Sequence, residues 1–114
     1  MLTETAIPVE AVFHALANPT RRRVVEQLGR GPASASALAQ AHDMALPSFH
    51  QHLRVLEQAG VVRSTKRGRV RTYRLAPARL RAAERWLAQQ RALWETRLDQ
   101  LDAFLTTDTP EQSE

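Results

Sequence analysis

Apolar positions recur at helical spacing near the start of the chain. The first run has the i, i+3, i+4, i+7 pattern of an amphipathic helix and consists of Val9, Val12, Phe13 and Leu16. Asn18 followed by Pro19 is typical of an N-cap and a first helical residue, because proline has no N–H to leave unpaired. We therefore expect a second helix from Pro19 to Leu28, which the run from Gly29 to Pro32 ends.

Two further helices are predicted on either side of a short turn. Ser34 or Ser36 can cap a short helix, since a serine oxygen accepts a hydrogen bond from an N–H of the first turn. Residues 42–45 form the turn, and the next helix begins at Pro47 and runs to Gly60. Two helices joined in this way form a helix-turn-helix.

After Gly60 the spacing of the residues changes from helical to alternating. Residues 61–66 and 70–75 are rich in β-forming residues, and the Gly68 region can turn between them. The second run alternates, with one face formed by Val70, Thr72 and Arg74 and the other by Arg69, Arg71 and Tyr73. This pattern predicts a β-hairpin with a basic edge.

A long final helix is expected to begin at Ala76 and Pro77 and to end at about Leu105. Its main apolar stripe repeats every seven residues and consists of Leu80, Leu87, Trp94 and Leu101, supplemented by Ala83, Leu98 and Leu105. A second set widens the apolar surface beyond one stripe: Trp86, Leu93 and Phe104. A domain this small cannot cover so much apolar surface, so we expect the helix to pack against its counterpart in a second subunit.

Length and composition indicate one domain. The 114 residues, 43% of them hydrophobic, suffice for one core and not for two ordinary domains. We expect a flexible segment over residues 1–7, a domain over residues 8–105 and a disordered polar tail over residues 106–114. No apolar run approaches the ~18 residues that span a bilayer. A secretory signal and cysteines are also missing, so we expect a cytoplasmic protein that does not bind a membrane.

Charge is distributed unevenly along the chain. No acidic residue lies between Glu57 and Glu84, and this segment contains eight basic residues: Arg63, Lys66, Arg67, Arg69, Arg71, Arg74, Arg79 and Arg81. From Glu84 onward the chain carries seven of its twelve acids. A solvated surface usually mixes both signs, so the acid-free segment favours a polyanionic partner.

The order of these elements and several of their residues resemble the ArsR/SmtB type of winged-helix repressor. The resemblance rests on residues 13–23 (FHALANPTRRR), Leu38 and Ala39, residues 52–62 (HLRVLEQAGVV) and residues 68–75. It covers about residues 8 to 105, and residues 86–105 are similar to a branch of the family without metal ligands. The family implies an α+β, mostly α fold with four helices, a two-stranded β-hairpin wing and a long C-terminal dimerisation helix.

The resemblance further implies a dimeric repressor of transcription that binds double-stranded DNA and needs no cofactor. In such proteins the first and last helices form the dimer interface, which predicts these interface residues: Val9, Phe13, Leu80, Leu87, Trp94, Leu98, Leu101 and Leu105. A symmetric homodimer places two recognition helices in successive major grooves, so a palindromic operator is expected. Metal-sensing relatives use Cys in the third helix or Asp and His on the last one. Here the third helix has no Cys, and the last has Asp99 and Asp102 but no His, so no metal is expected.

Two groups of residues are expected to contact DNA. On the helix that begins at Pro47, the side opposite the packed residues and its flanks carry Ser48, His50, Gln51 and Arg54. Gln51 suits adenine, Arg54 suits guanine or a phosphate, and Ser48 suits a phosphate. The hairpin tip adds four cations suited to phosphates: Lys66, Arg67, Arg69 and Arg71.

The histidines and the arginine run have more than one interpretation. His52 lies on the packed side, where a hydrogen-bonded core histidine is expected. The family commonly has serine at the position of His50, which either contacts DNA or is a tolerated surface residue. Of the run from Arg21 to Arg23, one side chain is expected to reach a phosphate and another to pair with an internal carboxylate.

Two alternative functions stay open: a winged helix used for protein–protein contact, and a metal-responsive repressor with an atypical site. The first explains the fold but not the acid-free basic segment. RNA is a poorer partner, because the basic segment holds a single aromatic residue, Tyr73, on which a base could stack. An enzyme is not expected, since the chain has no Cys nucleophile, no Gly-rich phosphate loop and no evident Ser, His and carboxylate set.

Overall fold

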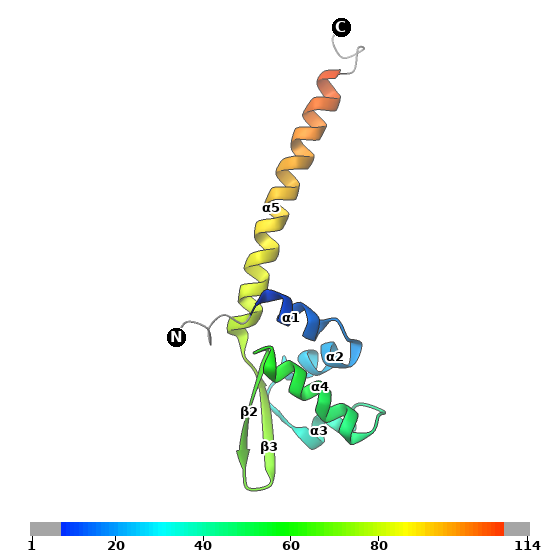
Figure 1. Cartoon of the computed structure of the whole chain (residues 1–114), viewed down its shortest axis with the longest axis vertical. Helices are drawn as coiled ribbons and strands as arrows, with labels where there is room; N and C mark the ends of the chain where they lie inside the picture. Colours follow the sequence, from blue (N-terminus) through cyan, green and yellow to red (C-terminus); the bar gives the residue numbers. More distant parts are fainter. Residues whose placement is uncertain (1–7, 109–114) are drawn as a thin grey trace. The chain divides into compact units, whose positions relative to one another are not determined.

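The computed structural model describes residues 8–108, which contain five helices and three strands (Figure 1). In chain order these are α1 (Val9–Leu16), α2 (Pro19–Leu28), β1 (Ala33–Ser34), α3 (Ala35–Gln40), α4 (Leu46–Gln58), β2 (Val62–Arg67), β3 (Val70–Leu75) and α5 (Pro77–Asp108). The chain divides into two compact units, one up to Ala83 and one from Glu84 onward. The predicted winged helix-turn-helix, mostly helical and with a β-hairpin, is confirmed.

Side-chain caps set the starts of two short helices. Asn18 Oδ1 accepts a hydrogen bond of 3.1 Å from the N–H of Arg21, and Pro19 follows as the first residue of α2. At α3 the open choice between two serines falls on Ser34, whose Oγ accepts from the N–H of Ala37 at 3.1 Å. Short helices gain little from propensity alone, so these caps help to place the helix-turn-helix.

The sheet has the strand order β1-β3-β2, and both pairs are antiparallel. Strands β2 and β3 form the wing, with Arg67 paired to Val70 across a two-residue loop. Gly68 has a φ of 60° and no described non-glycine residue has a positive φ, which matches a type II′ hairpin turn. The two-residue strand β1 was not predicted, because it exists only through its pairing with β3.

The core of the first unit is apolar and centres on α4. Phe49, Leu53 and Leu56 of this helix are at most 1% exposed. Around them pack buried residues of the other elements: Val12, Ala15, Val24, Leu28, Leu38, Val61, Val62 and Tyr73. One face of α4 is thus held rigidly, which leaves the opposite face in a defined orientation.

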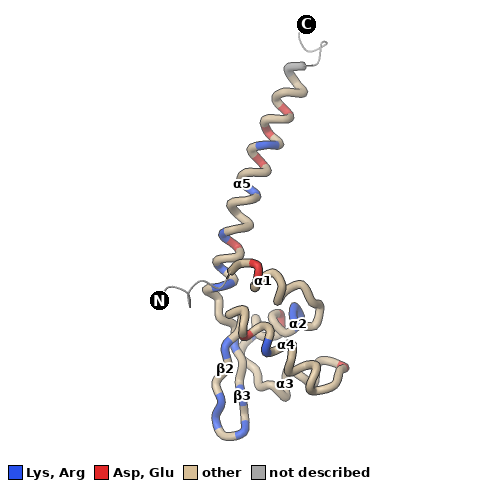
Figure 2. Tube along the Cα trace, in the orientation of Figure 1, with Lys and Arg blue, Asp and Glu red and all other residues tan. Residues whose placement is uncertain are grey.

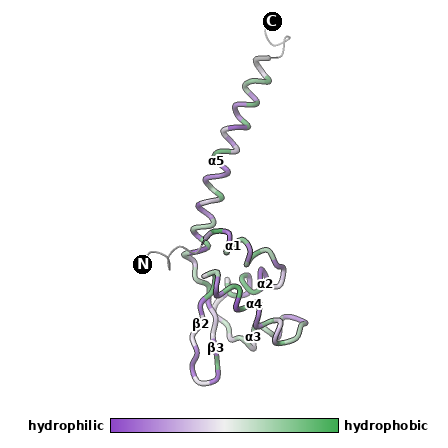
Figure 3. The backbone as a smooth tube through the Cα atoms, in the orientation of Figure 1, coloured by the Kyte–Doolittle hydropathy of each residue, from purple (hydrophilic) through white to green (hydrophobic). Residues whose placement is uncertain are grey.

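The second unit consists, over residues 84–108, of the rest of α5, on which apolar residues recur (Figure 3). The apolar side chains exposed here are Trp86, Leu87, Leu93, Trp94, Leu98, Leu101, Phe104 and Leu105. Neither this helix nor any other described one combines the length and hydropathy needed to cross a bilayer.

The predicted end of α5 was wrong by three residues. The helix continues to Asp108, so residues 106–108 of the expected disordered tail are helical. Polar residues such as Thr and Asp cost only about 0.5 kcal/mol each in a helix, and the first helix breaker after Pro77 is Pro110. The remainder of the expected tail, residues 109–114, and the expected flexible residues 1–7 lie outside the described residues.

Candidate nucleic-acid interface

The exposed face of α4 carries every residue that the sequence predicted to contact DNA from this helix. Ser48, His50, Gln51 and Arg54 are all exposed. Arg54 Nη1 donates a hydrogen bond of 2.6 Å to Gln51 Oε1, so the two side chains are held together one turn apart. A guanidinium has five N–H donors, and this contact therefore leaves Arg54 able to bind a guanine edge or a phosphate.

The wing concentrates positive charge (Figure 2). Its register places Arg63 opposite Arg74 and Lys66 opposite Arg71. Like charges directly opposite each other destabilise a hairpin, so this arrangement has no structural advantage for the isolated protein. A bound polyanion would remove the repulsion. Arg67 and Arg69 extend the same charge to the tip, where residues 65–71 are all exposed.

A hydrogen-bond chain connects the wing to the end of α4. Arg71 Nη1 donates to Ser64 Oγ at 2.8 Å, and Ser64 Oγ donates to Glu57 Oε2 at 2.8 Å. Burial, with a smaller contribution from the Glu57 charge, raises the pKa of Tyr73, which pairs with Ser64 across the two strands. These two hydrogen bonds link the wing to the end of α4. Glu57 was not predicted from the sequence, because its contact depends on the hairpin folding back onto the helix.

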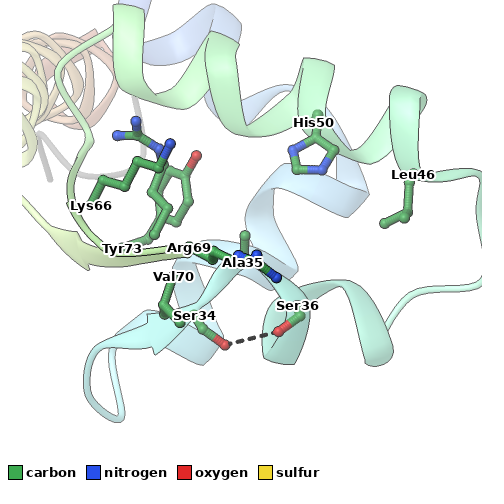
Figure 4. A pocket seen from close by; sticks show the side chains of 10 residues that line it. Ser34, Ala35, Ser36, Leu46, His50, Lys66, Arg69, Val70 and Tyr73 are labelled. Carbon is green, nitrogen blue, oxygen red and sulfur yellow. Dashed lines mark hydrogen bonds between the residues drawn. The ribbon is translucent and has the colours of Figure 1, made fainter.

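A cavity of ≈ 390 Å³ lies between the start of α3, the start of α4 and the wing (Figure 4). Besides Tyr73, its polar lining consists of Ser34, Ser36, His50, Lys66, Arg69 and Arg71. Four of these, all except the two serines, were predicted from the sequence as DNA contacts. Figure 4 shows His50 extending from α4 on the side of the cavity, and the hydroxyl oxygens of Ser34 and Ser36 lie 3.3 Å apart.

Arg21 connects α1, α2 and the buried side of α4. Its Nε donates to Ala15 O at 2.7 Å and its Nη2 to His14 O at 3.1 Å. Both acceptors lie at the end of α1, where a helix leaves carbonyls without intrahelical partners and attracts a cation. Arg21 Nη1 lies 3.1 Å from His52 Nδ1, and since arginine only donates, this His52 nitrogen accepts.

These contacts resolve two questions about the predicted residues. His52 is half-buried and hydrogen-bonded, as expected for a histidine that supports packing. The expected internal carboxylate partner of the arginine run is wrong for Arg21 and Arg22, because main-chain oxygens are their acceptors; Arg22 Nη1 donates to Leu16 O at 2.9 Å. The turn between α1 and α2 places these arginines at the carbonyls that end α1, an arrangement that the sequence pattern does not reveal.

His42 lies in the turn of the helix-turn-helix. Its Nε2 donates to Gln27 Oε1 at 2.9 Å, and its ring lies 5.0 Å from the ring of Phe49. Its Nδ1 is buried and has no hydrogen-bond partner among the described residues. Burial, then the Arg23 charge and then His52, lowers the pKa of His42; burial and then Arg21 lower that of His52. Both rings therefore favour the neutral state.

Side chains of the metal-ligand type are scattered over the described part of the chain. Nowhere in residues 8–108 do three or more His, Cys, Asp or Glu side chains gather closely enough to hold an ion. Asp99 and Asp102 lie on α5 without a histidine near them in sequence, and carboxylates alone are poor ligands for such metals.

Comparison with known proteins places this architecture among DNA-binding regulators. Residues 16–65 match a helix-turn-helix domain family. The transcriptional repressor SdpR of Bacillus subtilis is 32% identical over 76 residues, which are 67% of this chain and 84% of that protein. A crystal structure of an ArsR family transcriptional regulator is 51% identical, with a TM-score of 0.72 over 75% of this chain and 89% of that one.

A further similar structure is a homodimeric winged helix-turn-helix DNA-binding domain from Mycobacterium bovis, described as a possible ArsR-family regulator. It is 27% identical, with a TM-score of 0.58 over 81% of this chain and 82% of that one.

Proposed function

Since the chain belongs to the ArsR family of winged helix-turn-helix transcriptional regulators, we propose that it is a dimeric repressor that binds a palindromic operator in duplex DNA. The observation that carries the proposal is the exposed polar face of α4 beside a wing whose opposing cations repel each other. A rigid helix with a polar outer face fits the major groove, and a cationic hairpin tip fits phosphates or a narrow minor groove.

Within this interface we assign different roles to α4 and to the wing. Gln51 and Arg54 read bases, and Ser48 contacts a phosphate near the start of α4. Lys66, Arg67, Arg69 and Arg71 bind phosphates and contribute affinity without sequence preference. His50 lines the cavity beside the wing, which supports its assignment to the DNA-contacting set over a tolerated surface residue.

The dimer interface is proposed to lie on α5 and α1. Trp94, Leu98 and Leu101 are 55%, 60% and 50% exposed, an area of apolar surface that a stable helix in water would bury. The M. bovis domain is homodimeric, which supports the same assembly here. Val9, Phe13 and Leu80 are half-buried against the core and would form the edge of the interface.

We also assign the chain to the branch of the family that does not sense metals. The absence of a cluster of ligand-type side chains in residues 8–108, and of cysteine in the whole chain, supports this assignment. A metal-responsive repressor with an atypical site would need ligands from a second subunit or from outside residues 8–108.

The direct test is selection of bound duplexes from a random pool, followed by sequencing. We expect enrichment of an imperfect palindrome whose half-sites are ~10–11 bp apart, the spacing of two recognition helices on one side of the duplex. Retention of no duplex above background would contradict the proposal and would favour the protein-interaction alternative. Enrichment of single, unpaired half-sites would support DNA binding but would contradict a symmetric dimer.

A further inference from the structure

We propose that the cavity between α3, α4 and the wing binds one backbone phosphate of the operator, with Ser34 and Ser36 as ligands alongside the wing cations. The inference rests on the proposed function, because it names the group that the site takes from DNA. It also adds α3 to the elements that bind DNA, since the sequence predicted contacts only from α4 and the wing.

The charge of the cavity selects an anion. Lys66, Arg69 and Arg71 line one side, and none of its lining residues is acidic. Lys66 and Arg71 are directly opposite each other across the two strands, so an anion that lies between or beside them would relieve their mutual repulsion. The charge of Arg71 is partly balanced by Glu57, to which it connects through Ser64. The positive potential of the cavity therefore comes mainly from Lys66 and Arg69.

The two serines supply a directed donor. Ser34 Oγ accepts from the N–H of Ala37 as the cap of α3 and lies 3.3 Å from Ser36 Oγ. Each hydroxyl has one hydrogen, and the contact between the two uses one of them, whichever serine donates. The other hydrogen is left to donate to a third oxygen, and hydrogen bonds to an anionic oxygen are the stronger kind.

The position of the cavity favours a phosphodiester over a free ion. It opens between α4, proposed to enter the major groove, and the wing, proposed to contact the adjacent backbone. A strand of DNA that crosses from one to the other must carry its phosphates past the start of α3. Inorganic phosphate has the same chemistry, so the test has an arm for each source.

The test uses an isosteric pair of variants at Ser34. Aspartate and asparagine both cap a helix as well as serine does, so α3 should persist in Ser34→Asp and Ser34→Asn, with melting temperatures within about 2 °C of the wild type. Only aspartate places a negative charge where the phosphate would lie. We expect Ser34→Asp to weaken binding of the selected duplex about tenfold or more at 0.1 M salt, and Ser34→Asn less than about threefold.

A third variant measures the effect of added charge alone. Gln40→Glu puts the same charge on the other end of α3, about 9 Å along the helix and near one Debye length away, and should weaken binding less than about threefold. Equal affinities of Ser34→Asp and Ser34→Asn for the selected duplex would contradict a phosphate-binding site in this cavity, while DNA binding by the wild type would still stand. Failure of the wild type itself to bind any duplex would instead refute the proposed function.

The second arm uses inorganic phosphate without DNA. At matched ionic strength, we expect phosphate to change the melting temperature of the wild type no more than chloride does, because a single free ion lacks the neighbouring contacts of a duplex. A phosphate-specific rise in the wild type that Ser34→Asp abolishes, together with unchanged duplex binding by Ser34→Asp, would overturn the assignment to DNA in favour of a free oxyanion site.

Discussion

Gln51 and Arg54 hold each other on the face of α4 that lies opposite the buried Phe49 and Leu53, whereas Arg69 and Arg71 lie on an exposed hairpin. A side chain on a rigid helix can meet one base edge with fixed geometry. A cation at a hairpin tip meets the phosphates, which have the same charge at every sequence. Single-residue variants should therefore divide into two classes.

Gln51→Ala or Arg54→Ala should cost ~1–3 kcal/mol on the selected operator and much less on scrambled DNA, because a base contact is lost. Arg69→Ala or Arg71→Ala should weaken both duplexes alike and reduce the salt slope by about one per lost phosphate contact. Binding isotherms over a salt series, on both duplexes, measure the two effects. The roles would be reversed if only the wing variants changed sequence preference.

The neutral state of His42 predicts how stability depends on pH. Because burial lowers its pKa in the folded protein, the unfolded chain takes up a proton first as pH falls below about 6.5. The free energy of unfolding should then decrease from pH 7 toward pH 5, and His52 should contribute in the same direction. Denaturant titrations across this range measure the change.

His42→Gln provides the matched variant. Its amide nitrogen can replace Nε2 as the donor to Gln27 while removing the buried Nδ1, so the loss of stability on acidification should be smaller than in the wild type. His50→Gln, an exposed position, is the control and should keep the wild-type pH profile. An identical slope in His42→Gln would contradict the role of this ring and would leave His52 or other groups as the source of the decrease.

At the scale of elements, α5 and the wing each carry a feature that is unfavourable in a lone monomer. The helix exposes large apolar side chains along its second part, and the wing places cations opposite each other. A second apolar helix would cover the exposed side chains of α5, and a polyanion would neutralise the opposing cations of the wing. The two elements can therefore be tested separately.

Leu101→Asp should prevent dimerisation, because burial of a leucine contributes ~1.5–3 kcal/mol and a charge in its place must be desolvated. Thr96→Asp places the same residue on the polar side of α5 and should leave the dimer intact. Sedimentation velocity at micromolar concentration distinguishes the two states. A wild-type protein that sediments as a monomer would contradict the proposed interface.

For the whole molecule, charge separates along the chain. Residues 8–83 contain 13 Lys and Arg against four acids, whereas residues 84–108 contain three against five. The net charge of +4 thus understates the field of the helix-turn-helix unit. An uneven distribution of this kind steers a polyanion to one unit and makes the association rate depend on salt.

Metal ions should not control the repressor. Chelators, or stoichiometric Zn, Ni or Cd ions, should leave the affinity for the operator unchanged, since no described set of ligands fits them. Fluorescence anisotropy with labelled operator measures this directly. A stoichiometric titration that lowers the affinity about tenfold would contradict metal independence, and Asp99, Asp102 and the histidines would be the first candidate ligands to substitute.

The sequence by itself determined the helices, the hairpin and the exposed face of α4. Caps such as Asn18 and the positive φ of Gly68 act within three or four residues. The spacing of apolar residues in each helix can likewise be read directly from the sequence. The same local information gave the residues of α4 that point outward, because the buried and exposed sides of one helix follow from its spacing alone. The expected end of α5 at about Leu105 also had a local basis, the polar residues that follow it, but such residues cost little in a helix and α5 continues to Asp108.

Only the tertiary structure decided which distant residues meet. Arg21 reaches His52 across 31 positions, Glu57 reaches the wing through Ser64, and Ser34 shares a cavity with Arg69. No periodicity links such pairs, and a polar residue with several possible partners takes the one that chain folding brings within about 3 Å. The strand β1 has the same origin, since two residues form a strand only where β3 offers its free edge.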